Sequence, residues 1–160
     1  MSYHGNSDGP YVDKGALRAM FIAGFLFVAL VIAYFSITCS GPTYNDRLAA
    51  AESNIKLELH YSIYNYSYDN SDGVISLKIW NTGVVSTAKK AAEGDAEALK
   101  SWEQLKSATL HYSDYIFDEL ESHEITGLNV VVMLVNESNH DLKLLTYKNG
   151  ALVYDVTEGG

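Results

Sequence analysis

The chain has 160 residues, 48% of them hydrophobic, and its 20 acidic against 11 basic side chains give a formal net charge of −9 at pH 7. This balance argues against binding to nucleic acid, because phosphate backbones are bound by clusters of Lys and Arg. Since Cys39 is the single cysteine, the chain can form neither an intrachain disulfide nor a cysteine-based metal site.

The first feature along the chain is the uncharged apolar run AMFIAGFLFVALVIAYFSIT, which begins at Ala19. A helix of this length crosses the ~30 Å hydrocarbon core of a bilayer. We therefore predict a single-pass transmembrane helix at residues 19–40, in contact with membrane lipid. Lys14 and Arg18 precede it and only Arg47 follows closely, which predicts that the N-terminus is cytoplasmic and the C-terminal domain extracytoplasmic.

Two alternatives for this segment stay open, namely cleavage as a signal peptide and lipidation at Cys39. A signal peptide has a shorter apolar core followed by small residues at the cleavage site. The segment also resembles a lipoprotein signal, because Cys39 follows the apolar run, but that family has Leu and then Gly or Ala where this chain has Ser36 and Thr38. The length of the run favours an uncleaved anchor.

Four regions are therefore expected along the chain. Residues 1–18 form a short head and residues 19–40 the transmembrane helix. Gly41-Pro42 breaks the helix, and the Ala-rich stretch DRLAAAES predicts a short helix, so that residues 41–53 are a linker with a helix. The remaining residues, 54–158, are expected to form one domain of ordinary size.

The domain begins with two predicted strands. Between residues 54 and 63 apolar and polar side chains alternate with the period of two of a half-buried strand. Residues 68–73 then read as a turn, and residues 74–80 alternate again. The two segments therefore predict a β-hairpin.

A long helix and three further strands complete the prediction. Apolar residues recur with a period near 3.6 from Ala88 to Leu120, and Gly94-Asp95 divides this helix, with Asp95 as an N-cap. Residues 128–135 are apolar at nearly every position, which indicates a strand covered on both faces. The cover of its second face stays open between the short helix of residues 46–53, an oligomer partner and another membrane protein. Asn149-Gly150 then predicts a hairpin between the last two strands.

These elements predict an α+β domain of order ββαβββ, with a mostly antiparallel sheet packed on one long helix. The order is similar to that of profilin-like and PAS-like domains, a group that includes extracytoplasmic sensors which hold small ligands between sheet and helix. It also resembles longin-like and roadblock-like modules, which act as protein-interaction surfaces. The resemblance is one of element order and implies no site residues.

Two groups of side chains are candidate sites. Tyr64, Tyr66 and Tyr68, together with His60, concentrate aromatic rings in one stretch and form a candidate partner-binding surface. His111, Asp114 and Asp118 have the spacing of one helix face and form a candidate site for a divalent cation.

The chain has no G-x-S-x-G motif, no P-loop and no G-x-G-x-x-G motif, which argues against an enzyme, and nothing in it indicates a cofactor. We therefore expect a membrane-anchored, non-enzymatic binding or assembly module that binds another protein or a second copy of itself. A PAS-like small-ligand sensor is the first alternative, with a pocket between the sheet and the stretch from Trp102 to Ile116. A cation-binding surface domain is the second.

Overall fold

The computed structural model describes residues 25–34 and 41–158. The chain divides into two units, one ending at Thr43 and one beginning at Tyr44. Residues 25–34 are helical, with large apolar side chains exposed. In these ranges no helix is both long enough and apolar enough to cross a membrane. The predicted span of residues 19–40 lies partly outside the described residues, and the predicted head and Cys39 lie wholly outside them.

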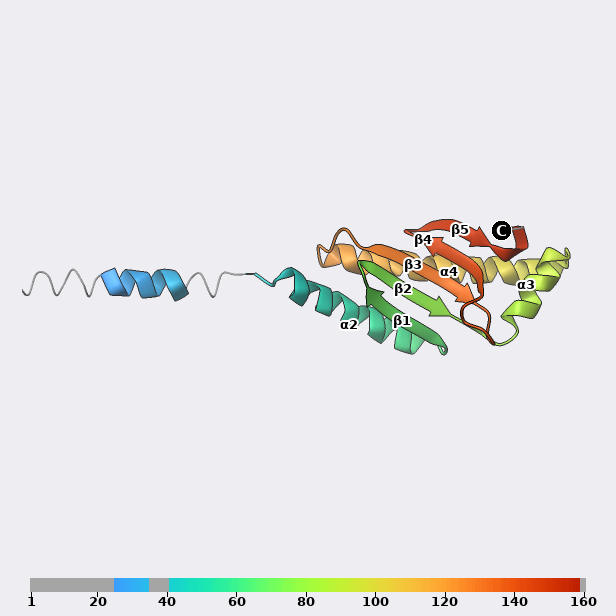
Figure 1. Ribbon diagram of the computed structural model, residues 1–160, viewed down its shortest axis with the longest axis horizontal. Helices are drawn as coiled ribbons and strands as arrows, with labels where there is room; N and C mark the ends of the chain where they lie inside the picture. Colours follow the sequence, from blue (N-terminus) through green and yellow to red (C-terminus); the bar gives the residue numbers. More distant parts are fainter. Residues whose placement is uncertain (1–24, 35–40, 159–160) are drawn as a thin grey trace, which may run out of the picture. The chain divides into compact units, whose positions relative to one another are not determined.

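The second unit confirms the predicted α+β class, with a mixed five-stranded sheet in the order β1-β2-β3-β4-β5. The sheet is mostly antiparallel, as predicted, but β2 and β3 pair in parallel across the two helices that connect them. Figure 1 shows the elements α2 (Tyr44–Ser62), β1 (Tyr66–Ser71), β2 (Val74–Ile79), α3 (Val84–Ala92), α4 (Ala96–Ser122), β3 (Asn129–Val135), β4 (Lys143–Lys148), β5 (Ala151–Asp155) and the 3-10 turn η1 (Val156–Glu158).

The predicted strand at residues 54–63 is wrong, because this stretch continues the helix α2. Its sequence fits both periods. Ala51, Ile55 and Leu59, spaced four residues apart, are fully buried, whereas Leu57 between them is exposed. The many Ala, Leu, Glu and Lys residues of the segment also favour a helix. The short helix predicted before residue 54 is therefore the first half of α2 and belongs to the domain.

The hairpin forms one segment later than predicted. β2 covers the second predicted strand, but its partner is β1, whose sequence YSYDNS lies mostly in the predicted turn. Asp72 and Gly73 make the turn with φ values of 53° and 76°, as a two-residue hairpin loop of type I′ requires. Tyr66, Tyr68 and Asn70 lie on the helix-covered face of the sheet, opposite the buried residues of β2.

The remaining elements lie where the sequence predicts them. Gly94, at φ 87°, separates α3 from α4, and the Asp95 carboxylate accepts a hydrogen bond from the Ala98 amide at 2.8 Å as the N-cap of α4. β3 matches the predicted buried strand, and Asn149-Gly150 joins β4 to β5 with both φ values positive.

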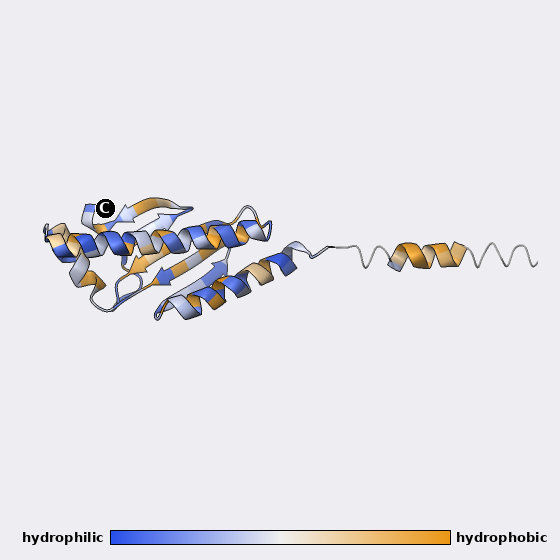
Figure 2. Ribbon diagram, turned by 180° about the vertical axis from the view of Figure 1, so that it is seen from behind, coloured by the Kyte–Doolittle hydropathy of each residue, from blue (hydrophilic) through white to orange (hydrophobic). Residues whose placement is uncertain are grey.

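One face of the sheet is covered by α2 and α4, which lie over the same side of it (Figure 2). α2 therefore does not cover the second face of β3, one of the three alternatives. Met133 and Val135 on that face are nevertheless 5% and 0% exposed. In Figure 1 no helix of the described domain lies over this face. Neighbouring strands flank the two side chains, with Lys78 and Thr146 paired to Met133.

Candidate binding site

The junction between α2 and β1 holds most of the predicted aromatic cluster. The Ile63 amide still donates to the Leu59 carbonyl at 2.9 Å, and its side chain is buried in the core. Asn65 accepts from the Trp80 amide at 3.2 Å, which ties the segment to the end of β2. Between these two fixed residues, Tyr64 is 100% exposed. A rigid junction thus presents an aromatic ring to solvent.

A hollow of about 380 Å³ lies beside Tyr64. Its lining residues come from the last turn of α2, the connecting segment and the start of β1, and they are His60, Tyr61, Ile63, Tyr64 and Tyr66. Tyr61 is 79% exposed, and its ring meets the His60 ring edge-on, with centroids 5.5 Å apart. Tyrosine rings supply a large contact area with few rotatable bonds, so this surface can bind a partner at a low cost in side-chain entropy.

A second hollow of about 250 Å³, which Tyr64 also lines, lies where α2 ends and α4 continues past it. Its floor is apolar, with Ile79 and Leu134 from the sheet and Leu105 from α4. The Tyr112 hydroxyl donates to the Ser62 carbonyl at 3.5 Å. Burial raises the pKa of Tyr112, and the nearby Glu58 carboxylate adds to the effect, so the hydroxyl stays protonated as a donor at neutral pH.

The predicted partner-binding residues therefore separate into two groups. His60, Tyr64 and Tyr66 line the first hollow. Tyr68 does not line it, because Tyr68 lies two residues further along β1, where the centroid of its ring is 5.1 Å from the Lys56 ammonium. Burial, followed by the charges of Glu52 and Asp69, raises the pKa of the Tyr68 hydroxyl. Tyr61, which the predicted strand would have buried, is exposed and also lines the first hollow.

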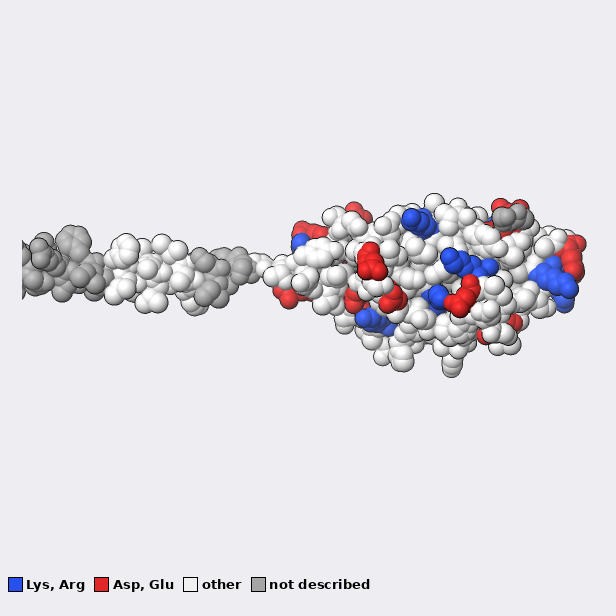
Figure 3. All heavy atoms as spheres, viewed as in Figure 1, with Lys and Arg blue, Asp and Glu red and all other residues white. Residues whose placement is uncertain are grey.

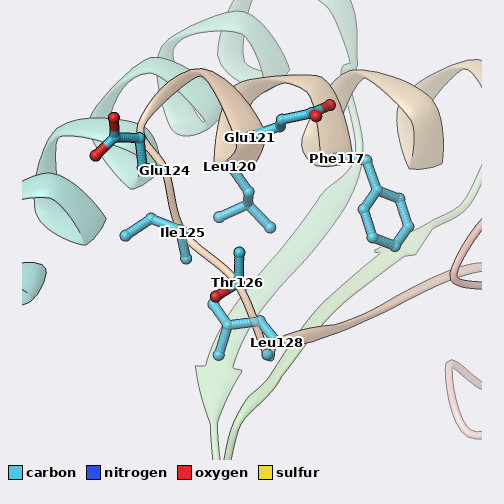
Figure 4. Close-up of a pocket in the computed structure, with 8 residues that line it drawn as sticks. Phe117, Leu120, Glu121, Glu124, Ile125, Thr126 and Leu128 are labelled. Atoms are coloured by element: carbon cyan, nitrogen blue, oxygen red, sulfur yellow. The ribbon is translucent and has the colours of Figure 1, made fainter.

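Another hollow, of about 370 Å³, lies where α4 ends and the chain turns into β3 (Figure 4). Phe117, Leu120, Ile125 and Leu128 form its apolar walls. The carboxylates of Glu121 and Glu124 point away from these walls in Figure 4. The Arg47 guanidinium at the start of α2 pairs with Glu124. This hollow therefore presents apolar groups and lacks an inward-directed charge among the residues drawn.

A buried polar cluster fixes the C-terminal end of the domain to α4. The side chain of Asp155 is 2% exposed and accepts hydrogen bonds from the Trp102 indole at 3.1 Å and from the Thr157 amide at 2.9 Å. The Lys106 ammonium lies 3.1 Å from the same carboxylate and 3.2 Å from Glu158. Because every member is paired and the cluster lies away from the hollows described above, we assign it to stability.

The structure does not bring the predicted cation ligands together into one site. His111, Asp114 and Asp118 are exposed along α4. Across residues 25–34 and 41–158, no group of three or more His, Cys, Asp or Glu side chains is arranged to hold a metal ion. The cation-binding alternative thus has no preformed set of ligands in this part of the chain.

Comparison with protein-family models, with curated proteins and with solved structures finds no match to this chain. The similarity in element order to profilin-like and PAS-like domains therefore stays an expectation, and the exposed aromatic surface at the end of α2 must be interpreted from its own geometry.

Proposed function

We propose that this chain is a membrane-anchored, non-enzymatic binding protein. The apolar segment of residues 19–40 would hold it in the bilayer, with the domain of residues 44–158 on the extracytoplasmic side. The domain would bind a protein partner through the aromatic surface of His60, Tyr61, Tyr64 and Tyr66. The observation that carries this proposal is the full exposure of Tyr64 on a junction fixed at Ile63 and Asn65.

Interface cores are enriched in aromatic residues and depleted in charge, and this surface has that composition. Tyr61, Tyr64 and Tyr66 surround the first hollow, and none of its five lining residues is an acid, a Lys or an Arg. Exposing such rings to water is unfavourable, so covering them with a partner would be favourable. A protein partner that places an apolar side chain in the hollow would bury them.

The test uses the full chain in its native membrane, with a photo-activated phenylalanine analogue at position 64. We expect one discrete cross-linked product at Tyr64 and none at the control position Ser101, which is exposed on α4. Tyr61→Ala should reduce the product by about tenfold, since losing an aromatic contact costs about 1–2 kcal/mol. Equal labelling at both positions would contradict the proposed surface.

A small-ligand sensor is the second candidate, because the hollow of about 250 Å³ lies against the predicted stretch between Trp102 and Ile116. Trp102 and Ile116 themselves are buried in the core. The hollow is smaller than the roughly 300–1,000 Å³ of typical ligand pockets. Its size therefore counts against a ligand in this particular hollow. A metabolite library that raises the melting temperature of the chain, with the effect lost in Ala108→Trp, would favour the sensor instead.

A further inference from the structure

The outward side of α2 has an uncharged stretch that begins after Asp46, which lies on the same side four residues before Ala50, and that is bordered by the exposed Lys56. After Asp46, the charged residues of this helix interact with neighbouring groups: Arg47 with Glu124, Glu52 with Asn70 and Lys56, and Glu58 with Ser62. The side opposite the buried Ala51, Ile55 and Leu59 consists of exposed residues, which are Ala49, Ala50, Ser53, Leu57, His60 and Tyr61.

This uncharged strip contains large apolar groups. Leu57 is 56% exposed and Tyr61 is 79% exposed, and Tyr64 continues the strip beyond the end of the helix. From Ala49 to Tyr61 the strip is about 18 Å long at 1.5 Å per residue.

The open face of the sheet is a weaker candidate for self-association. Figure 3 shows Lys and Arg together with Asp and Glu scattered over it. Lys78 pairs there with Asp141 at 3.4 Å, and both are at least one third exposed. Covering these groups would cost the desolvation of charges. The residues of the α2 strip from Ala49 to Tyr61 carry no formal charge.

We propose that α2 pairs with α2 of a second copy of this chain, and that this second copy is the partner of the aromatic surface. The inference rests on the proposed function. Two copies of an acidic protein repel each other except where charge is absent. Ala50, Ser53, Leu57 and His60 have the 3-4-3 spacing of a helix-pairing seam, and the small residues permit close approach near the start of α2.

The anchor explains why this strip is sufficient. A strip one helix wide covers far less than the roughly 800 Å² per partner of a stable interface. In two copies anchored in one membrane, α2 begins on the same side of the bilayer, so the two helices can pair in parallel. Confinement then makes pairing effectively intramolecular, which strengthens weak contacts by about 10²–10⁴-fold without new ones.

The test uses the full chain in membranes, with Cys39→Ser so that an introduced cysteine is the single one. Under copper–phenanthroline oxidation, Ser53→Cys should give a product of twice the 17.6 kDa chain mass. The matched control is Ser101→Cys, which is equally a serine on an exposed helix face. We expect Ser53→Cys to exceed Ser101→Cys at least about tenfold.

A second pair of variants tests the strip itself. Leu57→Asp should reduce the Ser53→Cys dimer about tenfold, because it places two like charges in the seam. Leu99→Asp, at an exposed leucine on α4, should leave it unchanged. Equal cross-linking at Ser53 and Ser101, or none at Ser53, overturns the inference.

Failure of the inference is distinguishable from failure of the anchor. Alkaline extraction of the same samples reports the anchor alone. A chain that stays in the membrane pellet without a Ser53-linked dimer has an anchor but no α2 pairing. A chain recovered in the soluble fraction contradicts the anchor, and its Ser53 and Ser101 yields then decide the pairing by themselves.

Discussion

Asp155 occupies the position in the described domain where a single side chain carries the most interactions. A carboxylate this deeply buried costs several kcal/mol unless it is paired. Burial acts to raise its pKa, but hydrogen bonds from Thr157, Lys106 and Trp102 outweigh burial, so the pKa lies below its ordinary value. The charged form is therefore the one that the fold stabilises.

Asp155→Asn should destabilise the domain by about 2–4 kcal/mol, because it removes the charge that holds the Lys106 ammonium and weakens the bond to Trp102. Urea unfolding of the purified chain, followed by tryptophan fluorescence, measures this loss. Asp141→Asn is the matched control, since its pair with Lys78 is exposed and should contribute less than about 1 kcal/mol. Equal losses in both variants would show that the buried cluster contributes no more to stability than the exposed pair.

Stability should also depend on pH through the same carboxylate. A group with a lowered pKa in the folded state contributes stability above its unfolded pKa of about 3.9 and loses it as pH falls through the folded value. The difference in unfolding free energy between wild type and Asp155→Asn should thus be constant above about pH 5 and shrink below about pH 4. A difference that grows on acidification would reverse the assigned direction of the pKa shift.

At the scale of elements, the local sequence was sufficient to predict a boundary where turn-forming residues mark the end of a helix or strand. Gly94-Asp95 and Asn149-Gly150 predicted a helix break and a hairpin, and both are confirmed. Residues 54–63 were misassigned because their apolar residues satisfy both the strand and the helix period. β1 was missed because YSYDNS contains no aliphatic residue; it is a strand through its pairing with β2.

The candidate site was predictable only in part, because the exposure of each aromatic residue depends on the strand pairing. Clustering of aromatic residues singled out Tyr64, Tyr66 and Tyr68, but exposure depends on which face each residue takes. Tyr66 and Tyr68 both face the helices, because β1 pairs with β2 in a register that places them opposite the buried Ile79 and Leu77, and both are partly buried. That register is set by tertiary contacts, which no local pattern contains.

Because α2 is a helix, substitutions at Ile55 and Leu57 should reduce the unfolding free energy by different amounts. Ile55→Ala should cost about 2–5 kcal/mol, because Ile55 is 0% exposed and its removal leaves a cavity. Leu57→Ala should cost less than about 1 kcal/mol, because Leu57 points to solvent. A strand would place both residues on one face and make their costs similar. Urea midpoints of the two variants therefore decide between helix and strand.

At the scale of the whole molecule, an acidic domain is joined to an apolar segment by a few residues. The domain has its own hydrophobic core, and the large apolar side chains of residues 25–34 are exposed. Burying those groups in lipid would remove their apolar surface from water, which is favourable by about 25 cal/mol for each Å². The anchor and the domain are therefore expected to fail independently when substituted.

Phe27→Arg combined with Leu30→Arg should release the full chain from the membrane, because each arginine near the centre of a span costs about 3 kcal/mol. The fraction left in the pellet after alkaline extraction measures the effect. Leu99→Arg with Leu142→Arg, at two exposed leucines of the domain, adds the same charge and should leave the fraction unchanged. Release of the wild-type chain would contradict the anchor. Retention of the Phe27 and Leu30 variant would instead favour a lipid attached at Cys39, because a chain held by that lipid does not depend on a spanning helix.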